Sequence, residues 1–534
     1  MPPVQPPSPA PLILFEDEYL LVVNKPGGMN THAPAPFAGE GLYDWLRHRE
    51  PRWASLAIIH RLDKETSGVM VFGKSTLANR SLTEQFTAHT IQKRYVLLTD
   101  QPVPPEPFMA ESRIVRLGEK YASQPLSGAG DLAQTQFRML SNGAGGTTVQ
   151  AEPLTGRTHQ IRVHAAAHGF PIRGDTLYDG TAGGRVCLHA ASLKLRHPAT
   201  GEMMTFEVAA DFSVDARAAL RAAVLDAAQT DCFRIVHGAS DGSPGWYAER
   251  LGDFVLSQSE HPLTGLQRSH LESLAGVTGV YHKTLNRRVR GTSPEQVSPQ
   301  LVFGEAAPER FVVRENGLRF ELSFNEGYSV GLFLDQRDNR RRFLVNHVAA
   351  DFPLFEGGAG GHEVLNTFAY TCGFSVCAAR AGARTTSLDL SKKYLEWGRR
   401  NFALNEIDPA AHDFIFGDVF DWLRRLGKKG RAFDAIVLDP PTFSQSKENG
   451  AFRAEKDYGR LVAAALPLLK RDGVLLASTN AAALEPPDFM DAIDDAVRAS
   501  GRRVTQRHYV PQPPDFPISR MEPAYLKTVW LRVR

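Results

Sequence analysis

The chain has 534 residues, too many for one hydrophobic core, so we expect two to four domains. Hydrophobic residues make up 43% and charged residues 22%, as in water-soluble globular proteins, and the formal net charge is only +2. This balance excludes a uniformly basic protein but allows local basic patches that bind nucleic acid. No run approaches 18 apolar residues, so we expect no membrane span and a cytoplasmic location. The four cysteines lack paired metal spacing, which predicts reduced thiols and no metal site.

The first part of the chain is predicted to be α+β. Residues 1–11 are proline-rich and have the composition of a disordered leader. Residues 12–212 follow as short strands with few helices, two of the helices being predicted at 76–90 and 157–169. Residues 213–230 are alanine-rich, and we expect them to form a helical connector with few anchoring groups. The turn-rich pattern of residues 231–320 predicts a small, mainly β middle domain.

The pattern changes in the last region, 321–534. Predicted strands alternate there with helices, at 363–368, 384–390, 413–418, 433–439 and 473–479. Such alternation predicts a parallel, doubly wound, Rossmann-like α/β sheet. Because no internal repeat links this region to the first one, the fold class we expect is multi-domain, with two unrelated large folds and two activities.

One charge cluster in the first region raises a chemical question. Asp63 stands between two predicted strands, in "IIHRLDKETSGVMVFGKS", with Arg61 and Lys64 beside it. Most isolated clusters of this kind are solvated turns. The later segments "QKRYVLL" and "PLTGRTHQIRVHAAAHG" add more cations, tyrosine and histidine. His159 and His164 are five residues apart and share no helical face, which argues against a zinc pair.

Together, "HRLDKETSG", "KRY" and "TGRTHQIRVH" resemble the motifs of the RluA-type pseudouridine synthases, over residues 12–212. The resemblance implies that Asp63 is the nucleophile or base at the ribose of a target uridine. It also implies that Arg162 holds the charge of Asp63, that Tyr95 lies against the uracil, and that Leu188 helps to wall the pocket. The isomerisation detaches and reattaches the same uracil, so it needs no cofactor, only an ionised carboxylate in a dry site and a flipped-out nucleotide.

A second set of motifs lies in the last region. Three predicted strands end in acidic residues, and such a residue can receive two ribose hydroxyls of a nucleotide-like cofactor. The segments "GLFLDQRDNRRRF", "LNTFAYTCG", "SLDLSKKYLEWGRRNFALN" and "LDPPTFSQSK" resemble S-adenosylmethionine-dependent methyltransferases of the RlmI/RlmK type, over residues 231–534. The resemblance implies cofactor contacts from Asn366, Thr367, Gly373, Asp389, Asp418 and Asp439, with Pro440 facing the substrate.

The sequence therefore predicts a bifunctional RNA-modifying enzyme, acting on large-subunit rRNA, with tRNA as the alternative for the isomerase. A competing hypothesis makes the last region an RNA-binding module without methyl transfer. Relatives of the second half divide between cytosine C5 and guanine N7, and attack at C5 normally needs a cysteine thiolate. Thr479 and Asn480 stand where relatives acting on cytosine carry "SCS". Guanine N7 is therefore favoured, with cytosine C5 as the alternative.

Overall fold

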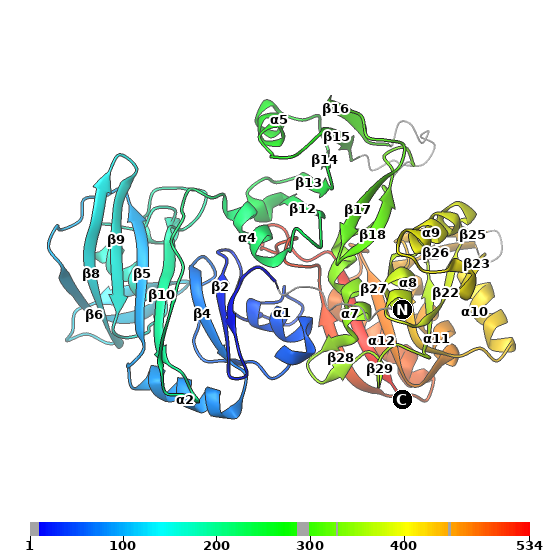
Figure 1. Cartoon of the computed structure of the whole chain (residues 1–534), viewed down its shortest axis with the longest axis horizontal. Helices are drawn as coiled ribbons and strands as arrows, with labels where there is room; N and C mark the ends of the chain where they lie inside the picture. The colour runs from blue at the N-terminus through cyan, green and yellow to red at the C-terminus, as the bar shows by residue number, and fades with distance from the viewer. Residues whose placement is uncertain (1–9, 286–297, 327–328, 447–449) are drawn as a thin grey trace.

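The computed structural model describes residues 10–285, 298–326, 329–446 and 450–534. Three sheet-bearing units follow one another along the chain, coloured blue to cyan, green, and yellow to red in Figure 1. Most of the predicted leader, residues 1–9, lies outside the described residues, and Ala10 is already buried in the first core. The multi-domain architecture predicted from the sequence is confirmed.

The first unit is built on one large sheet. Its strand order is β1-β2-β4-β10-β5-β9-β8-β6-β7, with β3 paired to β4 and β11 to β10. The strands are β1 (Ile13–Glu16), β2 (Leu20–Lys25), β3 (Ala57–Ile58), β4 (Ser67–Gly73), β5 (Gln92–Thr99), β6 (Phe108–Leu117), β7 (Lys120–Gln124), β8 (Asp131–Gly143), β9 (Gly146–Pro153), β10 (Leu188–Arg196) and β11 (Met203–Glu207). The helices are α1 (Leu42–Arg49), α2 (Thr76–Thr87) and α3 (Gln160–Ala167). Strand β4 is buried along its whole length, which explains its nearly continuous apolar sequence.

The connector contains helix α4 (Ala216–Val224) and is firmly anchored, contrary to the sequence-based expectation. Leu220 and Val224 pack into the first core. Arg221 donates two hydrogen bonds to Asp241, at 2.7 and 3.0 Å, and one to the carbonyl of Asp515 at 2.7 Å. The alanine-rich composition did not indicate that this helix has one apolar edge and one buried arginine. These two features connect all three units.

The middle unit carries a five-stranded sheet and a hairpin. The sheet contains β12 (Cys232–His237), β13 (Trp246–Leu251), β14 (Phe254–Ser259), β15 (Gly279–Thr284) and β16 (Gln300–Gly304), with α5 (Gly265–Glu272) beside it. The hairpin pairs β17 (Phe311–Glu315) with β18 (Leu318–Leu322). The predicted domain boundary at 320/321 falls inside β18, because Phe320 and Leu322 join a core that extends into the last unit.

The third unit has a seven-stranded sheet of order β23-β22-β21-β24-β27-β29-β28. The parallel strands are β21 (Glu363–Thr367), β22 (Arg384–Asp389), β23 (Asp413–Phe416), β24 (Phe433–Leu438) and β27 (Leu469–Thr479), and β28 (Val504–Val510) and β29 (Lys527–Val533) are antiparallel. The helices are α7 (Arg337–Val345), α8 (Gly373–Arg380), α9 (Lys392–Leu404), α10 (Val419–Lys428), α11 (Ala454–Ala465) and α12 (Pro486–Ala499). Short pairs β19 (His347–Ala349)–β20 (Phe352–Pro353) and β25 (Phe443–Ser446)–β26 (Gly450–Arg453) complete it. Parallel strands joined through helices confirm the predicted Rossmann-like sheet.

Helix α7, from the basic segment "DQRDNRRRF", joins the units. Its arginines are buried and paired: Arg337 with Asp515, Arg340 with Glu315, and Arg341 with Glu50 of the first unit. Trp45 on α1 also donates to Asp338 at 3.1 Å. A run of arginines that could serve a nucleic-acid surface is thus used inside the protein.

All four cysteines are free and buried. Within the described part of the chain, no helix has both the length and the apolar composition needed to cross a bilayer.

Candidate active sites

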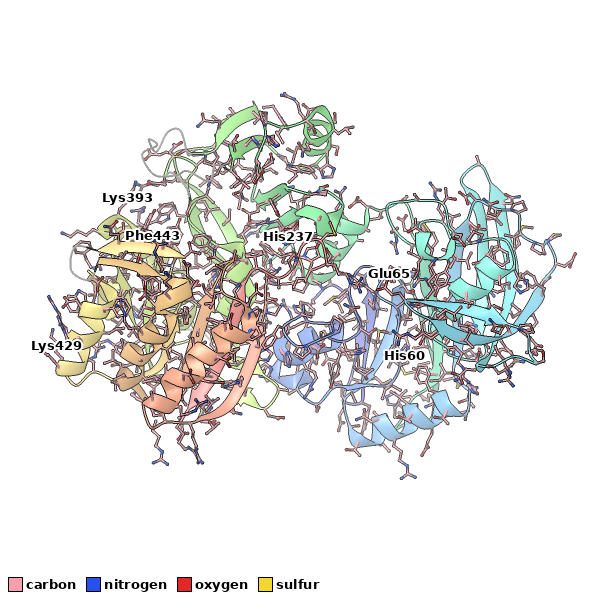
Figure 2. All side chains as sticks on the ribbon, turned by 180° about the vertical axis from the view of Figure 1, so that it is seen from behind. His60, Glu65, His237, Lys393, Lys429 and Phe443 are labelled. Atoms are coloured by element: carbon pink, nitrogen blue, oxygen red, sulfur yellow. The ribbon has the colours of Figure 1, made fainter. Side chains whose placement is uncertain are left out.

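Asp63 lies on the loop between β3 and β4, and a buried lysine fixes that loop. Nζ of Lys25 donates to the carbonyl groups of Pro26 (3.0 Å), Lys64 (3.1 Å) and Thr66 (2.8 Å). Burial lowers the pKa of the Lys25 ammonium to about 7, against the opposing effect of the nearby carboxylates. His60 and Glu65, at the two ends of this loop, appear in Figure 2 between the blue lobe that carries α1 and the cyan strands.

A glycine closes the loop at the start of β4. Gly68 has φ of +120°, and a Cβ there would lie 2.3 Å from the carbonyl oxygen of Ala190 on β10. Both the backbone angle and this close approach require glycine. The glycine that ends the "DKETSG" motif therefore sets how closely the Asp63 loop approaches β10.

Arg162, on α3, faces Asp63 but bonds mainly to another carboxylate. Its Nε and Nη2 donate to the two oxygens of Asp175 at 2.6 and 2.8 Å, and the side chains are only 3% and 1% exposed. Burial would lower the pKa of Arg162, but the bonds to Asp175 raise it above the ordinary value. The remaining nitrogen, Nη1, is buried, has no hydrogen-bond partner in the described part of the chain, and lies 3.7 Å from Asp63 and 3.8 Å from Glu65. Arg162 thus has a fixed position and one donor free to meet a carboxylate.

His159 and Tyr178 complete the surroundings of Asp63. Nε2 of His159 lies 4.0 Å from Asp63, and its Nδ1 lies 2.7 Å from the hydroxyl of Tyr178. That hydroxyl also accepts the N–H of Tyr121 at 3.0 Å, and its own proton is available to Nδ1 of His159. Burial lowers the pKa of His159 despite the charge of Asp63. The lowered pKa favours a neutral imidazole, and when its Nδ1 accepts the proton of Tyr178, the Nε2–H points toward Asp63.

Tyr95 and Leu188 lie on neighbouring strands at the base of the site. Tyr95 is on β5, and its pKa is raised by burial and, in addition, by the charge of Asp63. Leu188 begins β10, is buried, and belongs to a cluster against which Tyr95 packs. The structure therefore places Asp63, Arg162 and Tyr95 in one neighbourhood, with Leu188 behind Tyr95. Sequence reasoning missed Asp175 and Tyr178, for which "RGDTLY" gave no distinct signal.

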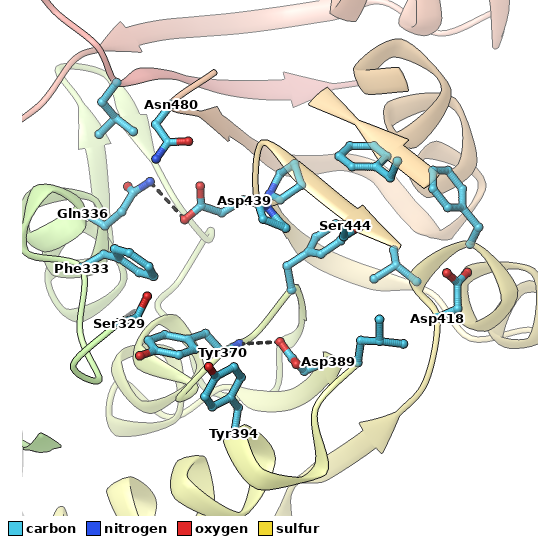
Figure 3. A pocket seen from close by; sticks show the side chains of 18 of the residues that line it. Ser329, Phe333, Gln336, Tyr370, Asp389, Tyr394, Asp418, Asp439, Ser444 and Asn480 are labelled. Atoms are coloured by element: carbon cyan, nitrogen blue, oxygen red, sulfur yellow. Dashed lines mark hydrogen bonds between the residues drawn. The ribbon is translucent and has the colours of Figure 1, made fainter. Parts of the chain in front are cut away.

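The second site is a cavity of about 310 Å³ at the carboxyl ends of the parallel strands of the third unit, shown in Figure 3. This is the edge at which open α/β sheets bind ligands. Its lining includes the predicted residues Asp389, Asp418, Asp439 and Pro440, and also Phe333, Asp335, Gln336, Phe368, Tyr370, Tyr394, Phe420 and Asn480. Aromatic side chains thus face carboxylates across the cavity.

Asp389, at the end of β22, organises one wall. Its two oxygens accept the N–H groups of Tyr370 and Ser391, each at 2.8 Å, and burial raises its pKa. The "LNTFAYTCG" loop that it holds has positive φ at Phe368, Tyr370 and Cys372. Non-glycine residues adopt this conformation at an energetic cost, and such strain concentrates at ligand sites. Asp389 keeps lone pairs for further donors, as ribose hydroxyls would supply.

Asp439, in the "DPP" motif, forms the opposite wall. Nε2 of Gln336 donates to it at 3.2 Å, the contact drawn in Figure 3. Burial, and then the charge of Asp335, raise the pKa of Asp439 to about 7. Gln336 and Asp335 come from the short 3₁₀ helix Leu334–Gln336 that leads into α7. Sequence reasoning recognised the motif "GLFLDQRDNRRRF", which contains these two residues, but did not assign them to the cavity.

Three predicted cofactor residues lie outside the cavity lining. Nδ2 of Asn366 donates to Ser375 at 2.9 Å, and Thr367 donates to the carbonyl of Val437 at 2.7 Å, so both side chains are used between strands. Gly373 begins α8, and a Cβ there would lie 3.2 Å from Arg340. These three residues support the binding loop and do not line the cavity.

Asp418 lines the cavity and also caps a helix. Its side chain accepts the N–H of Asp421 at 3.1 Å, at the start of α10. The cavity as a whole suits S-adenosylmethionine, because aromatic walls match a purine and a strand-end carboxylate matches a ribose diol.

One group of potential metal ligands was not foreseen. Glu40, His48 and His508 bring three ligand atoms within 4.8 Å of one another where the first and third units meet. The guanidinium of Arg342 lies 3.4 Å from Nε2 of His508, and this positive charge opposes a cation there. We therefore interpret the group as a half-buried polar contact between the units.

Comparison with known proteins supports both halves. Residues 19–167 match the RNA pseudouridylate synthase family, and residues 269–532 match an S-adenosylmethionine-dependent methyltransferase family. A ribosomal RNA large subunit methyltransferase of Deinococcus radiodurans is 36% identical over 335 residues, covering 60% of this chain and 78% of that protein. Ribosomal RNA large subunit methyltransferase I of Escherichia coli is 32% identical over 315 residues, covering 57% and 75%.

Among solved structures, human RNA pseudouridylate synthase domain containing 4 is 27% identical and covers 39% of this chain and 92% of its own, with a TM-score of 0.32. The fold and the two sites define an enzyme with two RNA-modifying centres. The chain belongs to the family of large-subunit ribosomal RNA methyltransferases, with an RNA pseudouridine synthase as its first part. It therefore carries an isomerase activity and an S-adenosylmethionine-dependent methyltransferase activity.

Proposed function

We propose that Asp63 carries out the isomerisation of uridine to pseudouridine, as nucleophile or base. The observation that carries this proposal is Nη1 of Arg162, which makes no hydrogen bond to any described residue and lies 3.7 Å from Asp63. A positive charge fixed by Asp175 keeps a carboxylate ionised while substrate excludes water. Asp175 is itself too deeply buried to meet a ribose, which leaves Asp63 and Glu65 as the carboxylates facing that donor.

The substitution Asp63→Asn tests this assignment. It keeps the size of the side chain and removes the charge, so pseudouridine formation should be abolished while methyl transfer continues. Glu65→Gln is the matched control, because Glu65 lies as close to Arg162 but is more exposed, and this variant should retain turnover. Pseudouridine is counted by chemical derivatisation and mass spectrometry of digested RNA. Measurable turnover by Asp63→Asn would disprove the assignment.

For the second half, we propose methylation of guanine at N7. S-adenosylmethionine supplies, when bound, a methyl group on a sulfonium centre. Guanine N7 offers an in-plane lone pair and needs no covalent activation, whereas cytosine C5 normally requires a thiolate. None of the four cysteines lines the cavity, and burial raises the pKa of the Cys372 thiol to about 12. Asn480 and Gln336 instead present amide groups there.

The proposed substrate of both halves is large-subunit rRNA. The names of the relatives from Deinococcus radiodurans and Escherichia coli support this choice. Unmodified large-subunit rRNA and tRNA transcripts should be incubated separately with the protein and S-adenosylmethionine, and their nucleosides identified. We expect 7-methylguanosine and pseudouridine in the rRNA. A product of 5-methylcytidine would overturn the choice of guanine, and pseudouridine formed only in tRNA would overturn the shared substrate.

A further inference from the structure

A long connection leaves the methyltransferase sheet between its last two strands. Residues 511–526, here called the connection, join β28 to β29 and run beside α4 as a red trace in Figure 1. It is held at two points along its length. Asp515, fully buried, accepts two hydrogen bonds from Arg337 at 2.6 and 2.9 Å. Glu522 accepts from the hydroxyl of Tyr247 at 2.8 Å. A segment fixed in this way has a defined outer surface.

That surface contacts the synthase at two places, one of which is the hairpin beside the Asp63 site. A Cβ on Gly39 would lie 3.1 Å from Ile518, so the two segments touch. Further along, Arg520 pairs with Glu119 at 3.0 Å, at the tip of the β6–β7 hairpin. Tyr121 of the same hairpin packs against His159, with ring centres 5.3 Å apart, and His159 faces Asp63.

A groove of about 90 Å³ lies between the connection and the synthase. Its lining includes Gly28 and Lys64 from the synthase and Gln512, Pro513, Phe516 and Ile518 from the connection. Gln512 is 5% exposed, and its Nε2 has no hydrogen-bond partner among the described residues. The lining also contains a carboxylate, Glu40, which is hydrogen-bonded to Nδ1 of His48 at 2.7 Å. The groove thus combines an ammonium, an unsatisfied donor and an apolar wall.

We propose that the connection forms one wall of the RNA cleft of the synthase, and that the groove binds the nucleotide next to the target uridine. This inference rests on the proposed site at Asp63. A uridine can reach a carboxylate only after leaving its stack, so the flanking backbone must be held. Lys64, the residue after Asp63, lines the groove, so its ammonium is available to the phosphate of that nucleotide. Gln512 donates to an oxygen of the same nucleotide, the proline and phenylalanine wall receives its base or ribose, and Arg520 meets the next phosphate.

Arg520→Ala and Gln512→Leu test the proposal in the full-length protein with unmodified large-subunit rRNA transcript. Each should raise the KM for pseudouridine formation about tenfold, the effect of losing one hydrogen bond to a charged group, with little change in kcat. Arg520→Ala should also lower the slope of log KM against log salt by about one. The rate of methyl transfer should be unchanged. Arg471→Ala, an exposed arginine paired only loosely to Asp472, is the control.

Glu119→Gln separates an RNA contact from a structural one. If Arg520 serves only to bridge to Glu119, this variant will raise KM as much as Arg520→Ala does, and the proposal falls. If Arg520 meets phosphate, Glu119→Gln will leave KM unchanged or lower it. An unaltered KM in both Arg520→Ala and Gln512→Leu would also overturn the inference. Failure of the unmutated protein to form pseudouridine would instead reject the proposed function itself.

Discussion

The buried pair between Arg162 and Asp175 gives a prediction with a calculable size. Both side chains are almost fully excluded from solvent, and the contact is bidentate at 2.6 and 2.8 Å. Removing one partner of such a pair leaves an uncompensated buried charge and costs about 3–5 kcal/mol. Arg162→Met should therefore destabilise α3 by this amount. Replacing both, as Arg162→Met with Asp175→Leu, should recover most of the stability, because no charge then remains unpaired.

Amide hydrogen exchange measured on the α3 peptide is the suitable assay, because a chain with several units need not unfold in two states. The single variant should lose about two to four powers of ten in protection, and the double variant should regain most of it. Neither variant should form pseudouridine, since both lack the cation at 3.7 Å from Asp63. Recovery of pseudouridine formation in the double variant would refute the role of Arg162, and unchanged protection in Arg162→Met would refute the energetic reasoning.

Three further outcomes follow from single contacts. The folded protein retains a proton on Asp439 up to about pH 7, whereas the unfolded chain releases this proton above about pH 4. The free energy of unfolding should therefore fall as the pH rises through that window, and Asp439→Asn should make the thermal midpoint less dependent on pH. Gly68→Ala should abolish pseudouridine formation through the 2.3 Å approach to β10, while Gly169→Ala, with φ of +82° and open space, should keep it. Arg341→Met should lower the thermal midpoint of the full chain by leaving Glu50 buried and unpaired.

Much of the architecture could be predicted, because local patterns determine it. Alternating strands and helices after residue 362 indicated the parallel sheet, and acidic residues at strand ends indicated Asp389 and Asp439 at its binding edge. Asn366 and Thr367 were placed in the same site by their position in a motif. Their side chains bond between strands instead, and such a turn inward depends on neighbours that the sequence does not reveal.

Contacts between distant segments were beyond sequence reasoning. Asp175 lies in an unremarkable turn, yet it fixes the arginine that faces Asp63. Gln512 and Arg520 lie some 450 residues along the chain from Asp63 and in the other half, so no spacing rule links them to it. Residues of this kind are recognised only when the units are seen together.

Helix α7 and the turn before it connect the methyltransferase cavity to the synthase. The 3₁₀ turn before it supplies Gln336 and Asp335 to the methyltransferase cavity, and Arg341 within it holds the synthase through Glu50. Arg337 fixes the connection that reaches toward Asp63. Separating the halves would leave the buried Arg341 and Glu50 without each other, at a cost that each half would bear alone. The buried pair of Arg341 and Glu50, whose charges come from different halves, therefore helps to hold the two sites in a set relation, as the proposed action on one RNA would need.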